Sequence, residues 1–207
     1  MQTMSPPTVD GQSLLDEAAV ARVVRLERFL RDQGDWEALA SCYTTDSSVR
    51  TTWFSGTGAE FAGASRVMAA NGRHSKHMIW PANIRINGDR ALSESPAAIL
   101  NRSVIDDTEV DMVQWCRFFS RLVRTEAGWR LASFEGIYQK DEIHPAWPGE
   151  KLPEHWAAEM RPLRGSYRVW AWAMRRRGYE VDGELLGDDR PDLLTAFYTA
   201  EDRWLAG

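Results

Sequence analysis

The chain has 207 residues, 43% of them hydrophobic and 27% charged, which is the ordinary balance of a globular protein with a substantial core. A formal net charge of −5 argues against nucleic acid as a partner, because nucleic-acid-binding domains present a basic surface. No apolar run approaches the ~20 residues that cross a bilayer, and the N-terminal residues lack the pattern of a secretory signal. Cys42 and Cys116 have neither metal-binding nor redox spacing, so we expect buried thiols in a reducing cytoplasm.

The N-terminal third of the chain predicts helices. Residues 1–12 are expected to be a flexible lead-in, because Pro6 and Pro7 oppose regular structure. Apolar side chains then recur at helical spacing, and Gly34 can take the left-handed conformation that ends a helix. Asp35 is typical of the N-cap of a following helix, which explains this acid without a catalytic role. The expected elements are helices over 13–33, 36–43 and 59–70, with a strand over 48–54.

Strands dominate the middle of the chain. Alternating runs rich in β-branched and aromatic residues predict strands over 77–86, 90–101, 110–123 and 129–140. Helices that come first and an antiparallel meander that follows indicate an α+β fold. The composition then changes to prolines, followed by helical patterns over 167–177 and 191–205. We therefore expect one domain over 13–142 and a helical C-terminal appendage over 143–207 that packs on it.

The order and spacing of several short stretches resemble the SnoaL-like branch of the nuclear transport factor 2-like superfamily. The stretches are Asp32-Gln33-Gly34-Asp35-Trp36, Cys42-Tyr43 with Asp46, His77, Asn87-Gly88-Asp89-Arg90-Ala91, Gly128-Trp129-Arg130-Leu131 and Ile137-Tyr138-Gln139-Lys140-Asp141. The resemblance implies a cystatin-like, cone-shaped α+β barrel, in which a curved antiparallel sheet wraps the long N-terminal helix and encloses an apolar pocket. The same fold serves dehydratases, a dehydrochlorinase, polyketide cyclases and non-catalytic dioxygenase β subunits, so the site must decide the function.

Asp32 and His77 are the leading catalytic candidates. Asp32 lies in the last turn of the first predicted helix, where a carboxylate opposes the negative end of the helix dipole and needs some other benefit. His77 opens a strand among apolar residues, which suits either a satisfied core histidine or a base. The resemblance implies a catalytic histidine at His77 and, at Asp32, the aspartate that orients it. We predict that the two side chains meet, ~2.6–3.2 Å apart or through one water, as a general-base pair.

Aromatic residues complete the predicted pocket. The phenol of Tyr138 can polarise a carbonyl or hydroxyl group, although a buried aromatic residue with a solvated tip fits the sequence equally well. Strand alternation places Tyr138 on one side with Phe134 and Gly136, without indicating which side is concave. Three tryptophans on predicted strands are expected to wall the pocket for a flat apolar ligand: Trp53, Trp80 and Trp115.

Charged residues stand in two apolar settings. Arg117 lies within an apolar strand, where an unpaired guanidinium is costly to bury. It anchors a substrate oxygen, pairs with Glu94 or Glu135 on a neighbouring strand, or faces solvent. Glu27 and Arg28 occupy the helix turn where several dehydratases of the family carry a tyrosine, so the resemblance does not extend to their full proton relay.

The sequence predicts a cofactor-independent lyase or isomerase that acts on a small apolar, aromatic or polycyclic molecule by dehydration, other elimination or retro-aldol cleavage. We expect no metal, because His74 and His77 lack a third ligand. The aromatic-rich surface favours a homo-oligomer, and the resemblance implies a trimer first, with a dimer as the second choice. Two alternatives remain open: a non-catalytic ligand-binding or dioxygenase β-like module, and a hydrolase in which an acid activates water.

Overall fold

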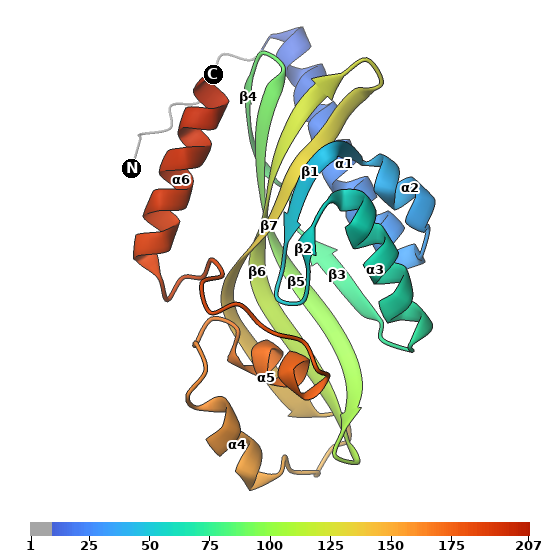
Figure 1. The fold of residues 1–207 in the computed structure, drawn as a ribbon, viewed down its shortest axis with the longest axis vertical. Coiled ribbons are helices and arrows are strands. Elements are labelled where there is room, and N and C mark those ends of the chain that lie inside the picture. Colours follow the sequence, from blue (N-terminus) through green and yellow to red (C-terminus); the bar gives the residue numbers. More distant parts are fainter. Residues whose placement is uncertain (1–9) are drawn as a thin grey trace.

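The fold is built on one long helix, α1 (Gly11–Gln33). A computed structural model describes residues 10–207 (Figure 1), so most of the predicted lead-in, residues 1–9, lies outside the described residues. The side chain of Asp10 caps α1 by accepting a hydrogen bond from the Ser13 N–H at 2.8 Å. The helix ends at Gly34, whose φ of 79° is the left-handed conformation expected there.

Two shorter helices follow at positions close to those predicted. The Asp35 side chain caps α2 (Trp36–Ser41) by accepting a hydrogen bond from the Ala38 N–H. A capping box formed by Thr57 and Glu60 begins α3 (Gly58–Ala70). α2 ends before its predicted end because Tyr43 already belongs to a strand.

Seven strands form one curved, open sheet in the order β2-β1-β7-β6-β5-β3, and β4 also pairs with β5. Their bounds are β1 (Tyr43–Arg50), β2 (Ser55–Gly56), β3 (Ser75–Ile79), β4 (Asn83–Asn87), β5 (Arg90–Ile105), β6 (Thr108–Thr125) and β7 (Gly128–Pro145). β1 runs parallel to β7, whereas the other pairings among these seven strands are antiparallel. The predicted α+β class is confirmed; the sheet contains one parallel pair and does not close into a complete barrel.

Two predicted strands have different bounds in the structure. The strand predicted over 77–86 is split into β3 and β4 at Trp80, Pro81 and Ala82. Pro81 has no N–H to donate to a strand ladder, which explains the break. The strand predicted over 48–54 starts at Tyr43 and stops at Arg50, because the chain then turns back to pair with β2.

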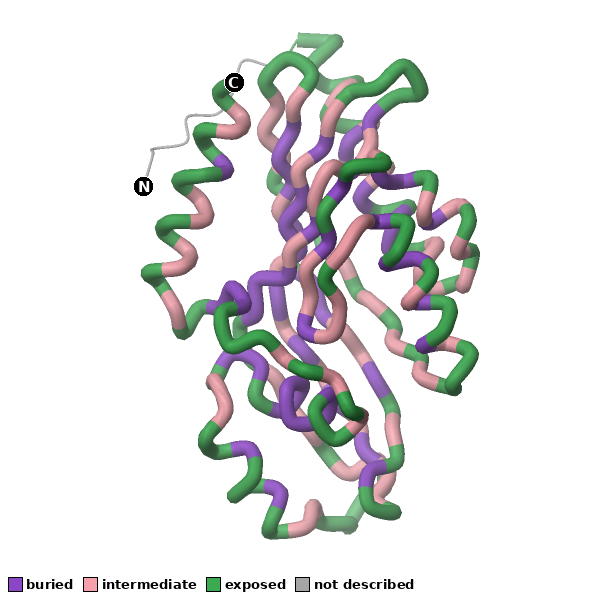
Figure 2. Tube along the Cα trace, in the orientation of Figure 1, coloured by how far each residue is buried: buried purple, intermediate pink, exposed green. Residues whose placement is uncertain are grey.

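The two faces of the sheet have different partners. α1 and α3 cover one face, here called the inner face, while α6 (Pro191–Ala206) lies against the opposite, outer face (Figure 1). Buried residues run along the middle of the long strands and over α5 (Arg168–Arg176), as Figure 2 shows. On the outer face, Phe119 and Ile137 are buried against apolar side chains of α6.

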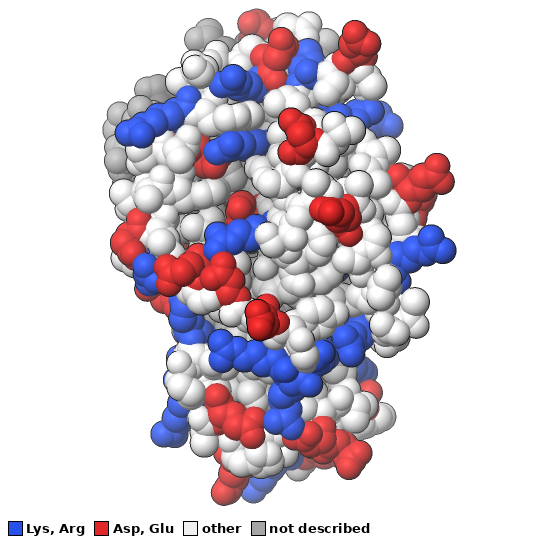
Figure 3. Space-filling model, in the orientation of Figure 1, with Lys and Arg blue, Asp and Glu red and all other residues white. Residues whose placement is uncertain are grey.

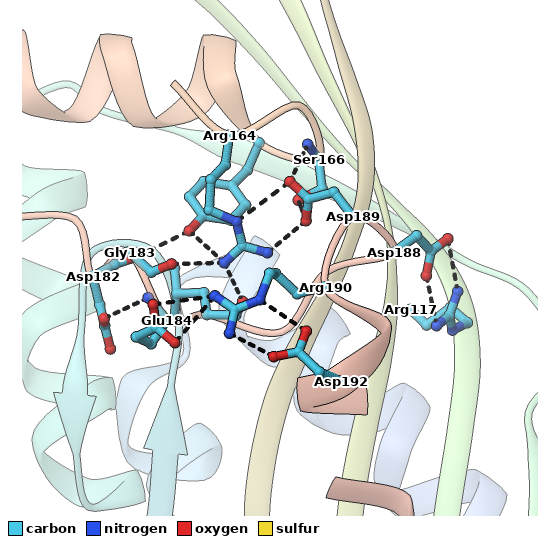
Figure 4. A network of polar contacts seen from close by, with 12 residues as sticks. Arg117, Arg164, Ser166, Asp182, Gly183, Glu184, Asp188, Asp189, Arg190 and Asp192 are labelled. Atoms are coloured by element: carbon cyan, nitrogen blue, oxygen red, sulfur yellow. Dashed lines mark hydrogen bonds and ion pairs between the residues drawn. The ribbon is translucent and has the colours of Figure 1, made fainter. Parts of the chain in front are cut away.

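The C-terminal appendage is bonded to the sheet as well as packed on it. It contains the two predicted helices, α5 and α6, and one that was not predicted, α4 (Glu154–Met160). The segment before α6 runs beside β7: the Tyr138 N–H donates to the Leu186 carbonyl at 3.0 Å, and the Tyr138 carbonyl accepts from the Asp188 N–H at 2.9 Å. Ion pairs such as that of Arg164 with Asp189 hold this segment in place (Figure 4).

On the face seen in Figure 3, basic side chains adjoin one another in a band across the lower middle, with acidic side chains above and below it. Within residues 10–207, no helix combines the length and the apolar character needed to span a membrane.

Candidate active site

The sheet, α1 and the appendage together enclose a cavity on the inner face. α1 contributes Arg28 and Arg31, β3 contributes His77, β7 contributes Tyr138, and α5 contributes Trp170. Most of the remaining wall is aromatic or aliphatic. The cavity volume is about 30 Å³, room for roughly two water molecules, so a ligand must displace side chains as it enters.

Asp32 and His77 meet at the edge of this cavity. The imidazole Nδ1 of His77 lies 2.6 Å from Asp32 Oδ1, and the His77 backbone N–H donates to Asp32 Oδ2 at 2.7 Å. The two side chains are buried, with exposed fractions of 3% for His77 and 11% for Asp32. The predicted contact is therefore present, and both carboxylate oxygens of Asp32 are occupied by the same histidine. The catalytic role of the pair remains a prediction.

The protonation states of Asp32 and His77 follow from their burial and from the groups around them. Burial lowers the pKa of His77 to about 4, although the hydrogen bond to Asp32 acts in the opposite direction. Burial alone would raise the pKa of Asp32, but the hydrogen bonds from His77 outweigh it and lower this pKa. Near neutral pH the pair is thus an ionised carboxylate and a neutral imidazole that donates its Nδ1–H. The lone pair of the other ring nitrogen, Nε2, is available for a proton.

Tyr138 points into the cavity from β7. It lines the wall with Phe134 and Gly136, the two residues that strand alternation groups with it. A Cβ atom on Gly136 would lie 2.8 Å from the Tyr138 hydroxyl oxygen, so only glycine leaves room for this ring. The hydroxyl oxygen accepts a hydrogen bond from the Thr52 N–H at 3.1 Å, and burial raises the pKa of the phenol. Tyr138 is therefore a neutral phenol beside the cavity.

Of the three predicted tryptophans, one lines the cavity. Trp53 does so from the turn between β1 and β2 and not from a strand. Trp80 follows β3, is 39% exposed, and packs against Trp115 with the ring centroids 6.3 Å apart. Phe118 lines the cavity from β6, so alternation turns Trp115 to the outer face. The prediction that Trp80 and Trp115 wall the pocket is wrong for this reason.

Arg117 also lies on the outer face and does not anchor a ligand in the cavity. Its Nε donates to Glu94 at 2.7 Å, and its terminal nitrogens reach Asp188 of the appendage, as Figure 4 shows. This ion pair is one of the alternatives that the sequence left open. Its assignment as a substrate-binding residue is wrong, since β6 turns it away from the cavity together with Trp115.

The sequence did not predict that Arg28 and Arg31 of α1 line the cavity, or that Glu27 is buried beside them. Glu27 and Arg28 are 1% and 4% exposed, and Glu27 accepts hydrogen bonds from the Arg28 guanidinium and the Tyr43 hydroxyl. Arg31 lines the cavity one turn further along. These positions lie on the same face of α1 as the buried residue Val24. Their helical spacing from Val24 is the sequence pattern that could have indicated their burial. Among residues 10–207, no three His, Cys, Asp or Glu side chains gather in an arrangement suited to a metal ion.

The chain belongs to the SnoaL-like domain family, whose sequence profile matches residues 12–135. The resemblance seen in the short sequence stretches is thereby confirmed. Among curated proteins, it is 32% identical over 127 residues to the uncharacterized protein AN9274 of Emericella nidulans, a match that covers 58% of this chain and 53% of that protein. It is also 26% identical over 188 residues to pea pathogenicity protein 2 of Fusarium vanettenii, covering 86% of this chain and 80% of the relative. The chain thus spans about half the length of the first relative.

Solved structures share the fold at low sequence identity. The Kfla4162 protein of Kribbella flavida superposes with a TM-score of 0.56 at 16% identity, covering 63% of this chain and 95% of that one. A hexachlorocyclohexane dehydrochlorinase, LinA type 2, gives a TM-score of 0.54 at 14% identity, covering 68% and 95%. A candidate scytalone dehydratase of Novosphingobium aromaticivorans gives 0.51 at 17% identity, covering 68% and 97%. The last two are a dehydrochlorinase and a dehydratase by name, but identities this low establish the fold alone.

Proposed function

We propose that this protein is a lyase or isomerase that removes a proton from a small, largely apolar ring compound without a metal or organic cofactor. The observation that carries the proposal is the 2.6 Å contact between His77 Nδ1 and Asp32 Oδ1 beside a cavity with aromatic walls. A neutral imidazole fixed in this way presents Nε2 as the base. The dehydratase and dehydrochlorinase that share the fold support the reaction class.

The proposed reaction needs one base and one donor. Nε2 of His77 takes a proton from a carbon next to an activating group, and the electron pair left behind forms the new double bond. The bond between the neighbouring carbon and the leaving group breaks, and the leaving group takes the bonding electrons. The imidazolium or the Tyr138 hydroxyl gives the leaving group a proton. Asp32 keeps the imidazole in its orientation and stabilises the imidazolium that forms. The cavity of about 30 Å³ is smaller than one ring, so a ring compound enters only as side chains move aside.

The test is proton transfer itself, which does not require the natural leaving group. Purified protein is incubated in heavy water with a panel of small cyclic ketones and β-hydroxy or β-chloro ring compounds, and exchange and elimination are followed by NMR and mass spectrometry. His77→Ala is expected to reduce exchange and turnover by roughly 10²–10⁴-fold, and Asp32→Asn to reduce both less, because it removes the charge and keeps the shape.

A matched control is available in His144→Ala, since the His144 side chain is 64% exposed and lies on the far end of β7. Circular dichroism checks that each variant is folded. Full activity in His77→Ala would remove this residue from the mechanism. Binding of ring compounds without exchange or turnover in the unmodified protein would favour the ligand-binding module instead.

A further inference from the structure

Arg31 has an unusual environment for a guanidinium inside a protein. It lines the cavity beside a pair of packed aromatic rings, 5.8 Å from the ring centroid of Trp53 and 5.5 Å from that of Phe61. Its Nε atom is buried and has no hydrogen-bond partner. Among residues 10–207, no carboxylate forms an ion pair with it. A guanidinium with a buried nitrogen normally has such a partner, because an N–H donor without an acceptor is costly to remove from water.

The nearby carboxylates are already occupied. Glu27 binds the guanidinium of Arg28 through both oxygens and accepts the Tyr43 hydroxyl at 2.7 Å. Both oxygens of Asp32 are bonded to His77. The two negative charges of Glu27 and Asp32 balance the two positive charges of Arg28 and Arg31. Of the two arginines, however, only Arg28 forms an ion pair with one of these carboxylates. The donors of Arg31 are therefore the one set of charged donors on this wall left without an acceptor among the described residues.

A second pocket adjoins the cavity and is lined by basic side chains. It has a volume of about 300 Å³ and shares Arg31 with the cavity. Arg73, His74 and Lys76 also line it, and the one carboxylate on its wall is Asp32, which is held by His77. Clefts lined by one sign of charge raise the local concentration of ligands of the opposite sign. An anion in this pocket meets Arg31, which also lies on the wall of the cavity.

We propose that the ligand of this cavity is an aromatic or cyclic carboxylic acid, whose carboxylate pairs with Arg31 while its ring lies against Trp53 and Phe61. A carboxylate matches the planar fork of a guanidinium, and the aromatic side chains beside Arg31 suit a flat ring. The inference names the substrate class of the site proposed above and in that sense rests on it. The carboxylate site, however, requires binding alone and not catalysis.

Anion binding at Arg31 also has a consequence for His77. The positive charges of Arg31 and Arg28 contribute to the low pKa of this histidine, which makes it a weak base in the empty cavity. A carboxylate on Arg31 offsets part of that positive charge, so the imidazole becomes more basic when the ligand is present. The base is then strengthened by the molecule on which it acts.

The test compares pairs of ligands that differ in charge and little in shape. Binding of benzoate and benzamide, and of cinnamate and cinnamamide, is measured by calorimetry and by tryptophan fluorescence, since Trp53 and Trp170 line the cavity. We expect each acid to bind at least about tenfold more tightly than its amide. In Arg31→Gln the acids are expected to lose this advantage while the amides bind as before. Arg22→Gln is the matched control, because Arg22 is exposed on the same helix.

The outcomes separate this proposal from the proposed lyase activity. His77→Ala should retain the preference for acids, so loss of turnover with an unchanged preference supports both proposals. If neither acid binds more tightly than its amide, or if Arg31→Gln keeps the preference, the carboxylate site is wrong, whatever His77 does. Inorganic phosphate that competes as well as benzoate would show a general anion site and would also contradict it. An NMR titration of the His77 ring should give a pKa about one unit higher with benzoate bound.

Discussion

Arginine has opposite surroundings on the two faces of the sheet. On the outer face, Arg117 and Arg121 each bind carboxylates, Glu94 and Asp188 in the first case and Glu201 in the second. On the inner face, Arg31 lies against two aromatic rings and pairs with no carboxylate of the described residues. The outer arginines attach the appendage to the sheet, and their donors are consumed in doing so. The lesson is that a charged residue marks a binding site when its donors are left unpaired, and its presence in an apolar strand or helix is not sufficient.

Breaking a pair on the outer face should have the largest effect on stability. Glu201 has a side chain that is 5% exposed, and Arg121, its partner at 2.7 Å, is 30% exposed. Arg121→Leu leaves this carboxylate buried without a partner, and we expect the free energy of unfolding to fall by roughly 3 kcal/mol. Guanidinium denaturation measures the loss, and replacing Glu201 by leucine in the same chain should restore most of it.

The control for that experiment lies on the same face. Arg85 pairs with Asp202, and the two side chains are 34% and 48% exposed. Because solvent screens this pair, Arg85→Leu should cost no more than about 1 kcal/mol. Equal losses in the two variants would mean that burial of the carboxylate does not determine the cost.

The inner face should respond to pH through His77. Its pKa is about 4 in the folded protein and ~6.5 in an unfolded chain, so the unfolded state binds more protons in between. The stability that comes from the neutral imidazole is complete above pH ~6.5 and is lost as pH falls toward 4. Between about pH 7.5 and about pH 5 we expect a loss of about 2 kcal/mol that is missing in His77→Gln. Denaturation curves of both proteins at the two pH values measure it, and parallel losses would contradict the assignment.

Removal of Arg31 should have the smallest effect on stability, and of the opposite sign. Arg31→Met breaks no ion pair and fills the same space with an apolar side chain, so we expect the free energy of unfolding to stay constant or to rise by up to about 1 kcal/mol. The measurement is the same denaturation experiment, run beside Arg121→Leu. A loss larger than about 1 kcal/mol would show that Arg31 has a structural partner after all.

Local patterns explain which features of the fold could be predicted. Helical phasing and turn residues gave the helices and the order of the strands, because these depend on neighbours in sequence. Pro81 was a visible signal for the break between β3 and β4, since proline cannot donate to a ladder. The wrong tryptophans have a different cause: alternation groups the residues of one strand, but only the packed sheet decides which group faces inward. Trp115 was therefore assigned to the wrong side, whereas Trp80 lies in the break between β3 and β4, where strand alternation does not apply.

The candidate site depends on contacts across long stretches of sequence. Asp32 and His77 were paired by resemblance to a family, and no local rule brings them together. The unpaired state of Arg31 is beyond sequence altogether, because it depends on where Glu27 and Asp32 direct their oxygens. The homo-oligomer, the cytoplasmic location and the division at residue 142 stay predictions.

The cavity is completed late in protein synthesis, because part of its wall comes from the appendage. Trp170 and Met174 of α5 form part of its wall, and Tyr138 is bonded through its backbone to residues 186 and 188. A ribosome makes these segments after the whole sheet. A nascent chain that has released β7 but not α5 therefore presents an apolar basin open on one side, the kind of surface that chaperones bind. The chain can therefore bind a ligand only after the appendage has left the ribosome and has covered the open side of the cavity.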